Sequence, residues 1–337
     1  MRIRIEDVAR AAGVSPATVS RVMNEENNVS ESTRQRVLDA MKALDYRPLA
    51  SARSLAGNRT FLIALLYDNN DNPSSTYLAE IQDGVLEACD AQRYSMMVRP
   101  LRMRDADLVR RLDSLVSDHH PDGLILTPPL TDFAPLVAFL HERALPFASV
   151  SPQHGEGVIG VAMNEQQAAR AMVEHLLSLG HRRIAHVTGL PSHGASRWRE
   201  AGYREAMAAA GLTVDPALVV QGGFTFTTGF EAGRQLLRLD PRPTAVFAAN
   251  DDMAAGLIWS AGEVGLRVPQ DLSVAGFDDV PLARQLWPPL TTVRQPSREM
   301  GKIAAAQLLE SLRGRGTGEL VQVPFSLELR QSTMPPG

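Results

Sequence analysis

The sequence predicts an α/β protein with an N-terminal all-α helix-turn-helix head and a hinge, followed by a two-lobed body of parallel α/β subdomains. In residues 5–44 the apolar side chains recur at helical spacing around a glycine turn. From Thr60 onward, short apolar strands alternate with amphipathic helices, which is typical of parallel sheets. The 337 residues, 44% of them hydrophobic, are enough for more than one core. We expect the head to span residues 1–46, the hinge 47–59 and the body 60–337.

The first helix of the head should end in a tight turn that leads into a second helix. Its buried face is expected to consist of Ile5, Val8, Ala9 and Ala12. Gly13 ends the helix because glycine adopts the left-handed backbone that the turn needs, and Val14 fills the angle between the helices. Ser15 caps the second helix. Pro16 takes its first position, where the missing N–H costs nothing.

The second helix, over residues 16–23, has the composition of a DNA recognition helix. Val19 and Val22 are expected to turn inward against the first helix. Its outer face can reach base edges and phosphates, and its members are Pro16, Ala17, Thr18, Ser20 and Arg21. An arbitrary three-helix bundle could share this apolar spacing, but the glycine turn and the capped second helix favour DNA binding.

A third helix follows a polar loop and completes the small core. Ser30 is its expected N-cap, and Glu31 favours the positive end of the helix. The residues expected to close the core from this helix are Val37, Leu38, Met41 and Leu44.

These residues resemble the head of the LacI/GalR family of bacterial transcription regulators. The family pattern D-V-A-x-x-A-G-V-S-x-x-T-V-S-R-V-x-N is matched from Asp7 to Asn24, and Y-R-P from Tyr46 and A-R-S-L from Ala52 follow it. One departure is Arg4, which stands where the family usually has a threonine that caps the first helix. The resemblance covers essentially the whole chain.

The resemblance implies a dimer that reads a near-palindromic double-stranded DNA operator. Residues 50–56 would form a hinge helix that pairs with its dimer mate in the minor groove, with Leu55 as a wedge between bases and Arg53 among phosphates. A solvated linker is the alternative. The expected DNA-contacting residues are Ser15, Pro16, Ala17, Thr18, Ser20, Arg21, Asn24, Ser30, Arg53 and Leu55. No leucine heptad follows the body, so a homodimer is expected rather than a tetramer.

Charge is distributed unevenly between the head and the body. Residues 1–60 hold ten Lys and Arg against seven Asp and Glu, a net charge of +3, which leaves −7 for the other residues. This distribution suits phosphate contact at one end and argues against general coating of nucleic acids. The chain begins with an amphipathic helix, has no long apolar run and contains a single cysteine, Cys89. We therefore expect a cytoplasmic protein without disulfides and without membrane contact.

The body is expected to contain two sets of alternating strands and helices. The predicted strands are 61–66, 94–98, 123–126, 147–149, 158–161, 184–188, 217–221, 245–248, 274–277, 320–323 and 327–330. The predicted helices are 75–92, 105–118, 132–143, 165–179, 197–210, 228–238, 251–264 and 297–313, and residues 291–294 are expected to cross back. Two lobes with several crossings resemble the periplasmic-binding-protein fold that the family uses as its effector domain, so this body is expected to bind effector and to dimerise.

Such a body holds its ligand between the lobes, outside the carboxyl ends of the strands. Arg199 lies in a segment that resembles the family's effector-binding arginine, and its guanidinium suits vicinal hydroxyls; a surface salt bridge is the alternative. Asn250 and Asp278 each follow a strand, and Asp278 resembles the family's acidic effector ligand. The family places an aromatic residue near Phe224, although Phe226 or Phe230 could take that role or belong to the core.

The first lobe is expected to contribute from its own strand ends. Asp68, Asn72 and Ser74 lie in a polar loop that is longer than the family's short N-P turn, so the loop is either a selectivity feature or a surface insertion. Thr127 also follows a strand. Asn164 does so too, but it is equally suited to capping the next helix.

Patterns typical of enzymes and metal sites are not convincing in this sequence. A G-x-G-x-x-G run begins at Gly155, but it precedes a strand instead of joining a strand to a helix. His119 and His120 are adjacent and so lack the spacing of a zinc pair. We therefore expect no catalysis, no cofactor and no metal.

The favoured function is a ligand-controlled repressor of carbohydrate-utilisation genes whose effector is a saccharide. Effector binding would close the lobes and shift the DNA-bound population, in a direction that the sequence leaves open. A purine or sugar-phosphate effector is the alternative, because some family members use such ligands. A solute-binding transport protein would need export, and the fused head counts against it.

Overall fold

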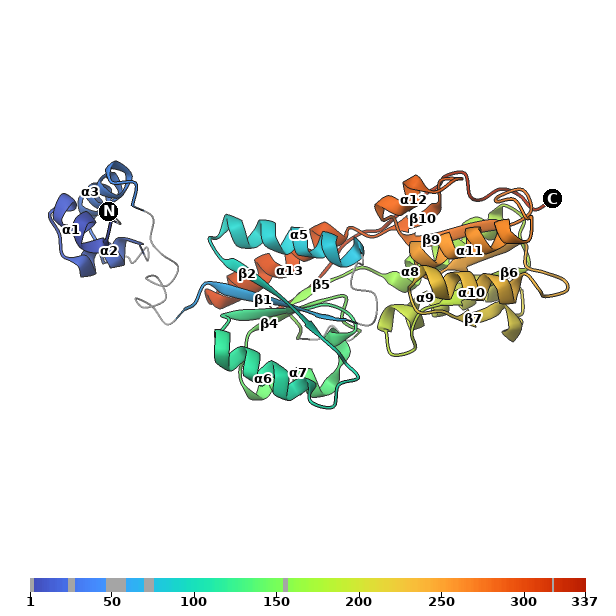
Figure 1. Cartoon of the computed structure of the whole chain (residues 1–337), viewed down its shortest axis with the longest axis horizontal. Coiled ribbons are helices and arrows are strands. Elements are labelled where there is room, and N and C mark those ends of the chain that lie inside the picture. The colour runs from blue at the N-terminus through green and yellow to red at the C-terminus, as the bar shows by residue number, and fades with distance from the viewer. Residues whose placement is uncertain (1–2, 24–27, 47–58, 70–75, 154–156, 317) are drawn as a thin grey trace.

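The computed structural model describes residues 3–23, 28–46, 59–69, 76–153, 157–316 and 318–337 (Figure 1). The expected hinge helix over 50–56 lies outside these residues. So do five predicted site residues, namely Asn24, Arg53, Leu55, Asn72 and Ser74.

The head consists of α1 (Ile5–Ala12), α2 (Pro16–Met23) and α3 (Glu31–Ala43). Val8, Val19 and Val37, one from each helix, are completely buried where the helices meet. Gly13 adopts a φ of 66°, as the predicted turn requires. Leu38 is 45% exposed, so its expected place in the core was wrong. Val37 and the 8% exposed Ala40 supply the buried face of α3 instead, because they lie three residues apart on one side of the helix.

The caps of the head form largely as expected. The Ser15 hydroxyl accepts a hydrogen bond from the Thr18 N–H at 3.1 Å, and the Ser30 hydroxyl accepts one from the Thr33 N–H at 3.4 Å. At the start of α1, the N–H of Arg4 donates to the carboxylate of Asp7 at 2.9 Å. The Asp7 side chain therefore satisfies the backbone at the position where residue 4 lacks a capping hydroxyl.

The first lobe is a parallel six-stranded sheet with helices on both faces (Figure 1). In spatial order its strands are β11 (Leu320–Gln322), β5 (Gly160–Ala162), β4 (Phe147–Val150), β3 (Gly123–Leu126), β1 (Leu62–Asp68) and β2 (Ser95–Leu101). One face is covered by α5 (Thr76–Ala91) and α13 (Ser297–Leu312), the other by α6 (Leu108–His119) and α7 (Ala134–Glu142), which follows the short turn Leu130–Asp132.

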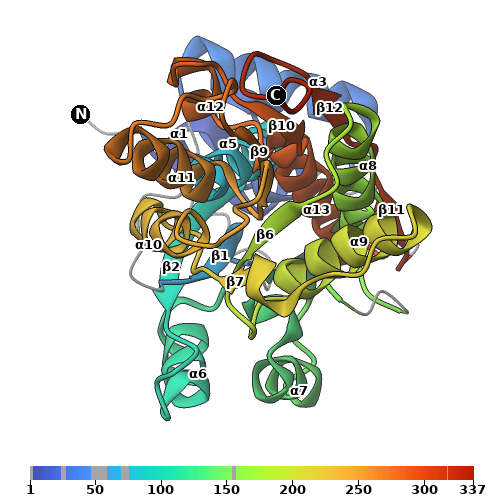
Figure 2. The same cartoon turned by 90° about the vertical axis from the view of Figure 1, so that its right-hand side faces the viewer.

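The second lobe repeats this architecture with one antiparallel edge strand. In spatial order its strands are β12 (Ser326–Glu328), β10 (Thr291–Arg294), β9 (Ser273–Asp278), β8 (Ala245–Ala248), β6 (Ile184–Thr188) and β7 (Val219–Gln221). On one face lie α8 (Glu165–Ser178) and α9 (Gly194–Ala209), on the other α10 (Phe226–Leu236) and α11 (Asp251–Glu263) (Figure 2). Two shorter helical segments are Pro216–Leu218 and α12 (Pro281–Gln285). The antiparallel edge strand is β12, which pairs with β10.

The chain passes between the lobes after β5, after β10 and after β11. Residues 291–294 were expected to cross back, but they form β10, which pairs in parallel with β9 and places Thr292 opposite Gly276. The crossing follows them, because α13 packs against α5 in the first lobe.

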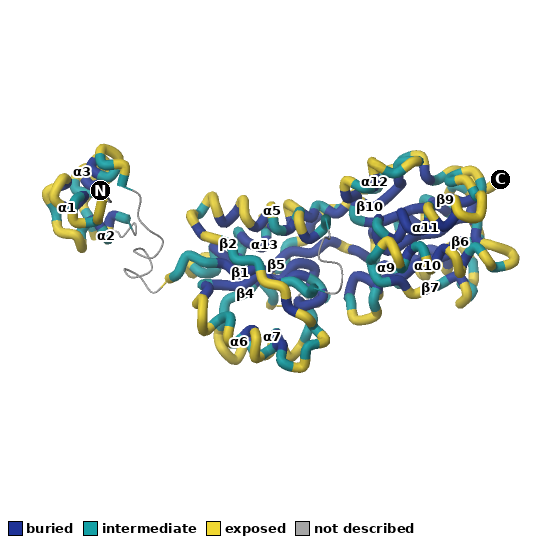
Figure 3. Tube along the Cα trace, in the orientation of Figure 1, coloured by how far each residue is buried: buried dark blue, intermediate teal, exposed yellow. Residues whose placement is uncertain are grey.

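Burial explains why the strands read as continuous apolar runs. The four residues from Ile63 to Leu66 in β1 are all completely buried, because helices cover both faces of the sheet (Figure 3). Polar residues follow these runs at the strand ends, and in both lobes such ends contribute to the space between the lobes, as Asp68 does from β1 and Asp278 from β9.

Candidate functional site

A cavity of about 140 Å³ lies between the lobes, and we call it the interlobe cavity. Of the eight predicted effector residues, the six that the structure describes all line it: Asp68, Thr127, Arg199, Phe224, Asn250 and Asp278. Asn72 and Ser74 lie outside the described residues. Strand ends in both lobes therefore bring together side chains that are up to 210 positions apart in the sequence.

Arg199 lies at the centre of a buried polar network. Its Nε donates to Oε2 of Glu165 at 2.8 Å, and its Nη1 donates to the carbonyl of Ala249 and lies 3.6 Å from Oδ1 of Asp278. The guanidinium also lies over the ring of Phe277, 3.7 Å from its centroid. The arginine is thus neither a surface residue nor free, because its position is set by partners from α8, from the residue after β8 and from β9.

Asp278 ends β9 and faces the same cavity. Its Oδ1 accepts a hydrogen bond from the Gln295 amide at 2.5 Å. Burial raises the pKa of Asp278 to about 7, although Arg199 and Gln295 act in the opposite direction. Near neutral pH this carboxyl group can therefore either donate or accept a hydrogen bond.

Of the three phenylalanines considered, Phe224 lines the interlobe cavity, and Phe226 and Phe230 do not. Phe224 lines the cavity beside the ring of His193, with centroids 5.0 Å apart. Phe226 is 44% exposed and lies instead against Trp259. The backbone of Phe224 adopts a φ of 62° and that of Asp278 a φ of 116°, and such strained conformations of non-glycine residues concentrate at functional sites.

Asn250 has less free hydrogen-bonding capacity than its position at a strand end suggested. Its Oδ1 caps α11 by accepting from the Met253 N–H at 3.0 Å, and its Nδ2 donates to the carbonyl of Phe224 at 3.1 Å. The second proton on Nδ2 is the donor that remains for a ligand. Asn250 therefore also fixes the loop that carries the aromatic ring.

The two first-lobe residues are held by the backbone around them. Oδ1 of Asp68 accepts from the Met103 N–H at 3.0 Å, and the Thr127 hydroxyl donates to the carbonyl of Leu66 at 3.2 Å. Asn164, whose role was left open, caps α8 by accepting from the Gln167 N–H at 2.9 Å, and it does not line the interlobe cavity.

Sequence reasoning missed several cavity residues, among them Glu165, Gln295, His193 and Tyr77. Gln295 directly follows β10 and could have been found by the strand-end argument, had 291–294 been recognised as a strand. Glu165 is the first residue of α8, where an acidic side chain is common and so gives no signal of a buried pair. His193 and Tyr77 precede or begin helices and follow no pattern that marks a site.

The charges around the interlobe cavity do not favour an anion. Its described lining contains three carboxyl groups, from Asp68, Glu165 and Asp278, against one guanidinium, from Arg199. Burial and, to a smaller extent, the charges of Arg199 and Arg197 lower the pKa of His193 to about 3, so this side chain is neutral at physiological pH.

Two other acidic residues near the cavity hold the structure together. Asp251 is completely buried and accepts hydrogen bonds from the Thr292 hydroxyl at 2.6 Å and the Val280 N–H at 3.0 Å. Asp279 accepts hydrogen bonds from Arg284, Arg294 and Arg330, and these bonds hold the loop that follows β9.

The predicted recognition surface of the head is exposed. Ser15, Pro16, Ala17 and Arg21 are exposed, and Thr18 and Ser20 are half-buried. The hydroxyls of Ser15 and Thr18 lie 2.9 Å apart and bond to each other, and Ser30 is engaged as a cap. Ala17 and Arg21 therefore retain side chains without a capping role.

Within the described residues, no group of three or more His, Cys, Asp or Glu side chains is arranged to hold a metal ion. In the same part of the chain, no helix combines the length and the apolar character needed to cross a membrane.

Comparison with known proteins gives matches over the head and the body. Residues 4–48 match the family described as bacterial regulatory proteins, lacI family, and residues 173–333 match the periplasmic binding protein-like domain. The HTH-type transcriptional repressor PurR of Photobacterium profundum is 35% identical over 318 residues, which cover 92% of each chain.

Solved structures give similar matches over nearly the whole length. The complex of the transcriptional regulator CelR with cellobiose is 33% identical, with a TM-score of 0.75, and the match covers 98% of this chain and 100% of that one. The lac repressor dimer bound to operator and the anti-inducer ONPF is 30% identical, with a TM-score of 0.79 and coverage of 99% and 100%.

Proposed function

The chain belongs to the lacI family of bacterial regulatory proteins, and we propose that a neutral saccharide in the interlobe cavity controls its binding to operator DNA. Like the repressors it resembles, it is a DNA-binding transcriptional regulator. A solute-binding protein is not favoured, because the helix-turn-helix head is part of the chain.

The observation that carries the proposal is the set of polar groups that both lobes present to one small cavity beside an aromatic ring. Arg199, Asn250 and Asp278 offer donors and acceptors from the second lobe, and Asp68 and Thr127 offer them from the first. Sugar hydroxyls both donate and accept, and the apolar face of a sugar ring can stack on Phe224.

The charge balance of the cavity separates the candidate effectors. The one guanidinium of the described lining, that of Arg199, already pairs with Glu165, and the remaining carboxyl groups are Asp68 and the partly ionised Asp278, so the cavity opposes a dianionic ligand. A sugar phosphate is therefore the least favoured class. A neutral purine base is the second candidate, since Phe224 and Asn250 suit a flat ring with amide-like edges. A cavity of about 140 Å³ is below the roughly 300–1,000 Å³ usual for drug-sized ligands and suits a small molecule.

In this proposal, residues 1–46 bind DNA, residues 47–59 act as the hinge, and residues 60–337 bind effector and dimerise. Ala17 and Arg21 bias the choice of bases, and Leu55 enters the minor groove at the centre of a near-palindromic operator. A homodimer follows from the two-fold operator, and the lac repressor structure is that of a dimer on its operator. We assign the protein to the cytoplasm, where its DNA target lies, and propose no catalytic activity for it.

Effector binding would act through the spacing of the lobes. A ligand that contacts Asp68 in one lobe and Asp278 in the other favours the closed arrangement of the lobes. Closure then changes the fraction of dimers whose hinges and heads can engage DNA, and the coupling is reciprocal, so operator DNA must alter effector affinity by the same factor.

A thermal-shift screen tests the effector class. The purified full-length chain is heated with monosaccharides and disaccharides, neutral purines, and sugar phosphates at the same concentrations. A rise in Tm with a neutral sugar that is reduced in Phe224→Leu supports the proposal. A rise with purines or sugar phosphates alone would replace the saccharide with that class.

A further inference from the structure

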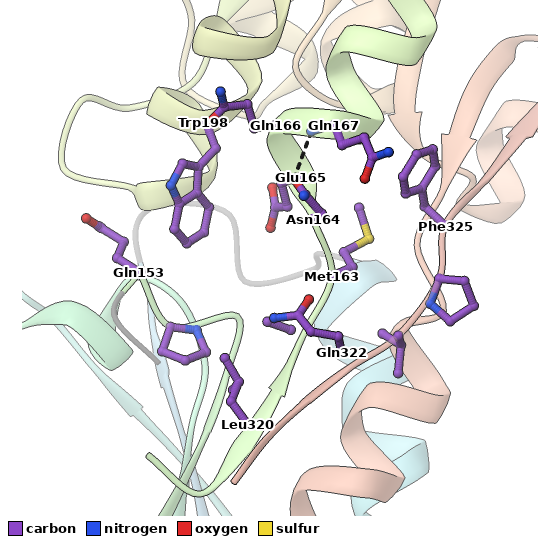
Figure 4. Close-up of a pocket in the computed structure, with 14 residues that line it drawn as sticks. Gln153, Met163, Asn164, Glu165, Gln166, Gln167, Trp198, Leu320, Gln322 and Phe325 are labelled. Carbon is purple, nitrogen blue, oxygen red and sulfur yellow. Dashed lines mark hydrogen bonds between the residues drawn. The ribbon is translucent and has the colours of Figure 1, made fainter. Parts of the chain in front are cut away.

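A second, larger hollow lies on the flank of the lobe connections, outside the interlobe cavity (Figure 4). Its volume is about 780 Å³, within the range of roughly 300–1,000 Å³ that small-molecule sites usually have. We call it the hinge groove after the chain connections between the two lobes, which are distinct from the hinge of residues 47–59. It is built around two passages of the chain between the lobes, Met163–Gln167 and Leu320–Phe325, with Gln153 and Trp198 on its other side.

Amide side chains and two aromatic rings form half of the lining of the hinge groove, and most of the rest is apolar. Figure 4 shows Trp198 and Phe325 on opposite sides, with Gln322 between them. Both rings are half-buried, so each has a face that a ligand can cover. The other amide side chains of the lining are Gln153, Asn164, Gln166 and Gln167.

Several of these amides have unused hydrogen-bonding capacity. Within the described part of the chain, the side-chain amides of Gln167 and Gln322 form no hydrogen bond, and both residues are exposed. Gln166 donates to Glu205 at 2.7 Å, and Gln153 accepts from Arg197, so these two are already engaged. The side chains of Gln167 and Gln322 can each offer two donors and one carbonyl acceptor.

The lining of the hinge groove carries almost no free charge. Glu165 is the one ionisable side chain among its described lining residues, and this carboxylate is bonded to Arg199 at 2.8 Å with 2% of its side chain exposed. Among the described lining residues a charged ligand would find no unpaired counter-ion, and the nearby guanidinium of Arg197 is bonded to Gln153. A ligand with many hydroxyls matches amides that donate and accept, and its C–H faces match the two rings.

From this arrangement we infer that the hinge groove is a second ligand site, which binds a neutral saccharide of about two rings independently of the interlobe cavity. The walls come from both lobes, since Gln153 and Gln322 belong to the first and Trp198 and Gln167 to the second. A ligand held between them stabilises one spacing of the lobes. Occupancy of the hinge groove therefore also biases the closure that the effector controls.

The intrinsic fluorescence of Trp198 gives a direct test. The chain has three tryptophans, and replacing the exposed Trp259 and Trp287 by phenylalanine leaves Trp198 as the reporter. Full-length protein is titrated with cellobiose and with maltose, and glycerol at equal osmolality serves as the solvent control. We expect a saturable change in Trp198 emission with at least one disaccharide and none with glycerol.

Further variants separate the two sites. The disaccharide affinity obtained from the Trp198 emission should fall by at least about tenfold when Gln167 and Gln322 are both replaced by alanine, because two hydrogen bonds are lost. The emission change should persist in Gln270→Ala, an exposed glutamine elsewhere, and in Phe224→Ala, which damages only the interlobe cavity. Loss of the signal in Phe224→Ala would place its origin in the interlobe cavity and overturn the second site without affecting the proposed function.

Isothermal titration calorimetry provides an independent test of disaccharide binding. Titration of the otherwise unmodified chain with the same disaccharide should show a binding event that Trp198→Ala removes. The absence of any saturable Trp198 response, or a response that the double glutamine variant retains in full, overturns the inference. A response to the uncharged peptide acetyl-trialanine amide but to neither disaccharide would show that the groove takes peptides instead.

Discussion

Nε of Arg199 lies 2.8 Å from Oε2 of Glu165, and the two side chains are only 5% and 2% exposed. The pair joins the second turn of α9 to the first residue of α8, where the chain has just entered the second lobe. Glu165 lines both the interlobe cavity and the hinge groove. An arginine that was identified from its resemblance to effector-binding residues is therefore also a structural element of the second lobe.

Replacing Arg199 by alanine should destabilise the protein strongly. The change leaves the Glu165 carboxylate buried without its partner, and breaking a buried pair in this way typically costs about 3–5 kcal/mol. Urea unfolding of both proteins measures the difference. Arg204→Ala is the matched control on the same helix, since the Arg204–Glu200 pair is far more exposed and should contribute little. Equal, small losses in the two variants would show that the buried pair is not structurally important.

Phe224→Leu should weaken saccharide binding by about tenfold and leave operator affinity without ligand unchanged. Leucine retains apolar volume but cannot present a flat face, and aromatic contacts of this kind contribute roughly 0.5–1.5 kcal/mol beyond burial. Isothermal titration calorimetry measures the affinity. Phe226→Leu serves as the control because Phe226 is exposed and lies outside the cavity. A larger effect from Phe226→Leu would show that the saccharide contacts the ring of Phe226 and not that of Phe224.

The titration of Asp278 should make stability fall with rising pH. Its pKa is about 7 in the folded protein and about 3.9 in an unfolded chain, so between these values only the folded state binds the proton. The resulting stabilisation is complete below about pH 4 and is lost as the pH rises to about 7. Each pKa unit corresponds to about 1.4 kcal/mol.

Asp278→Asn isolates this effect from the histidines, whose lowered pKa values act in the opposite direction. The free energy of unfolding of the variant minus that of the parent should increase as the pH rises from 5 to 8. Urea unfolding at each pH measures this difference. A difference that stays constant over this range would show that Asp278 is already ionised at low pH.

Arg21→Ala should weaken binding to a selected operator by about 1–3 kcal/mol and relax the choice of bases at one position in each half-site. Arg21 is exposed on the outer face of α2 and takes no part in capping the head. Fluorescence anisotropy with the operator and with unrelated DNA measures both effects. Arg36→Ala, an exposed arginine on α3, should change the two affinities little. If Arg21→Ala lowers both affinities equally, Arg21 contacts only phosphate.

The sequence was sufficient to predict residues whose role follows from local pattern. Ser15 and Ser30 cap helices as expected, and the strand-end rule located Asp68, Thr127, Asn250 and Asp278 in one cavity. These predictions hold because a cap depends on three or four neighbouring residues and because parallel strands in one sheet end at a common edge.

Other features depend on contacts that no local pattern encodes. Leu38 fits the apolar spacing of α3 but faces solvent, since α1 and α2 cover only the side that carries Val37 and Ala40. The strand β10 was missed because its polar side chains Thr291 and Thr292 are buried, where their hydroxyls bond to Thr333 and Asp251. The hinge groove combines Trp198 with Gln322, and their proximity follows only from the way the chain passes between the lobes.

Operator binding as a function of ligand tests the central claim most directly. A duplex selected in vitro by the full-length protein is titrated in the presence of neutral saccharides, neutral purines or sugar phosphates at one ionic strength. We predict that a neutral saccharide changes operator affinity by at least about fivefold, the lower range of typical allosteric coupling, and that Phe224→Leu shifts this response to higher saccharide concentrations. An operator affinity that responds only to a purine or a sugar phosphate, or to no ligand of these classes, would contradict the account.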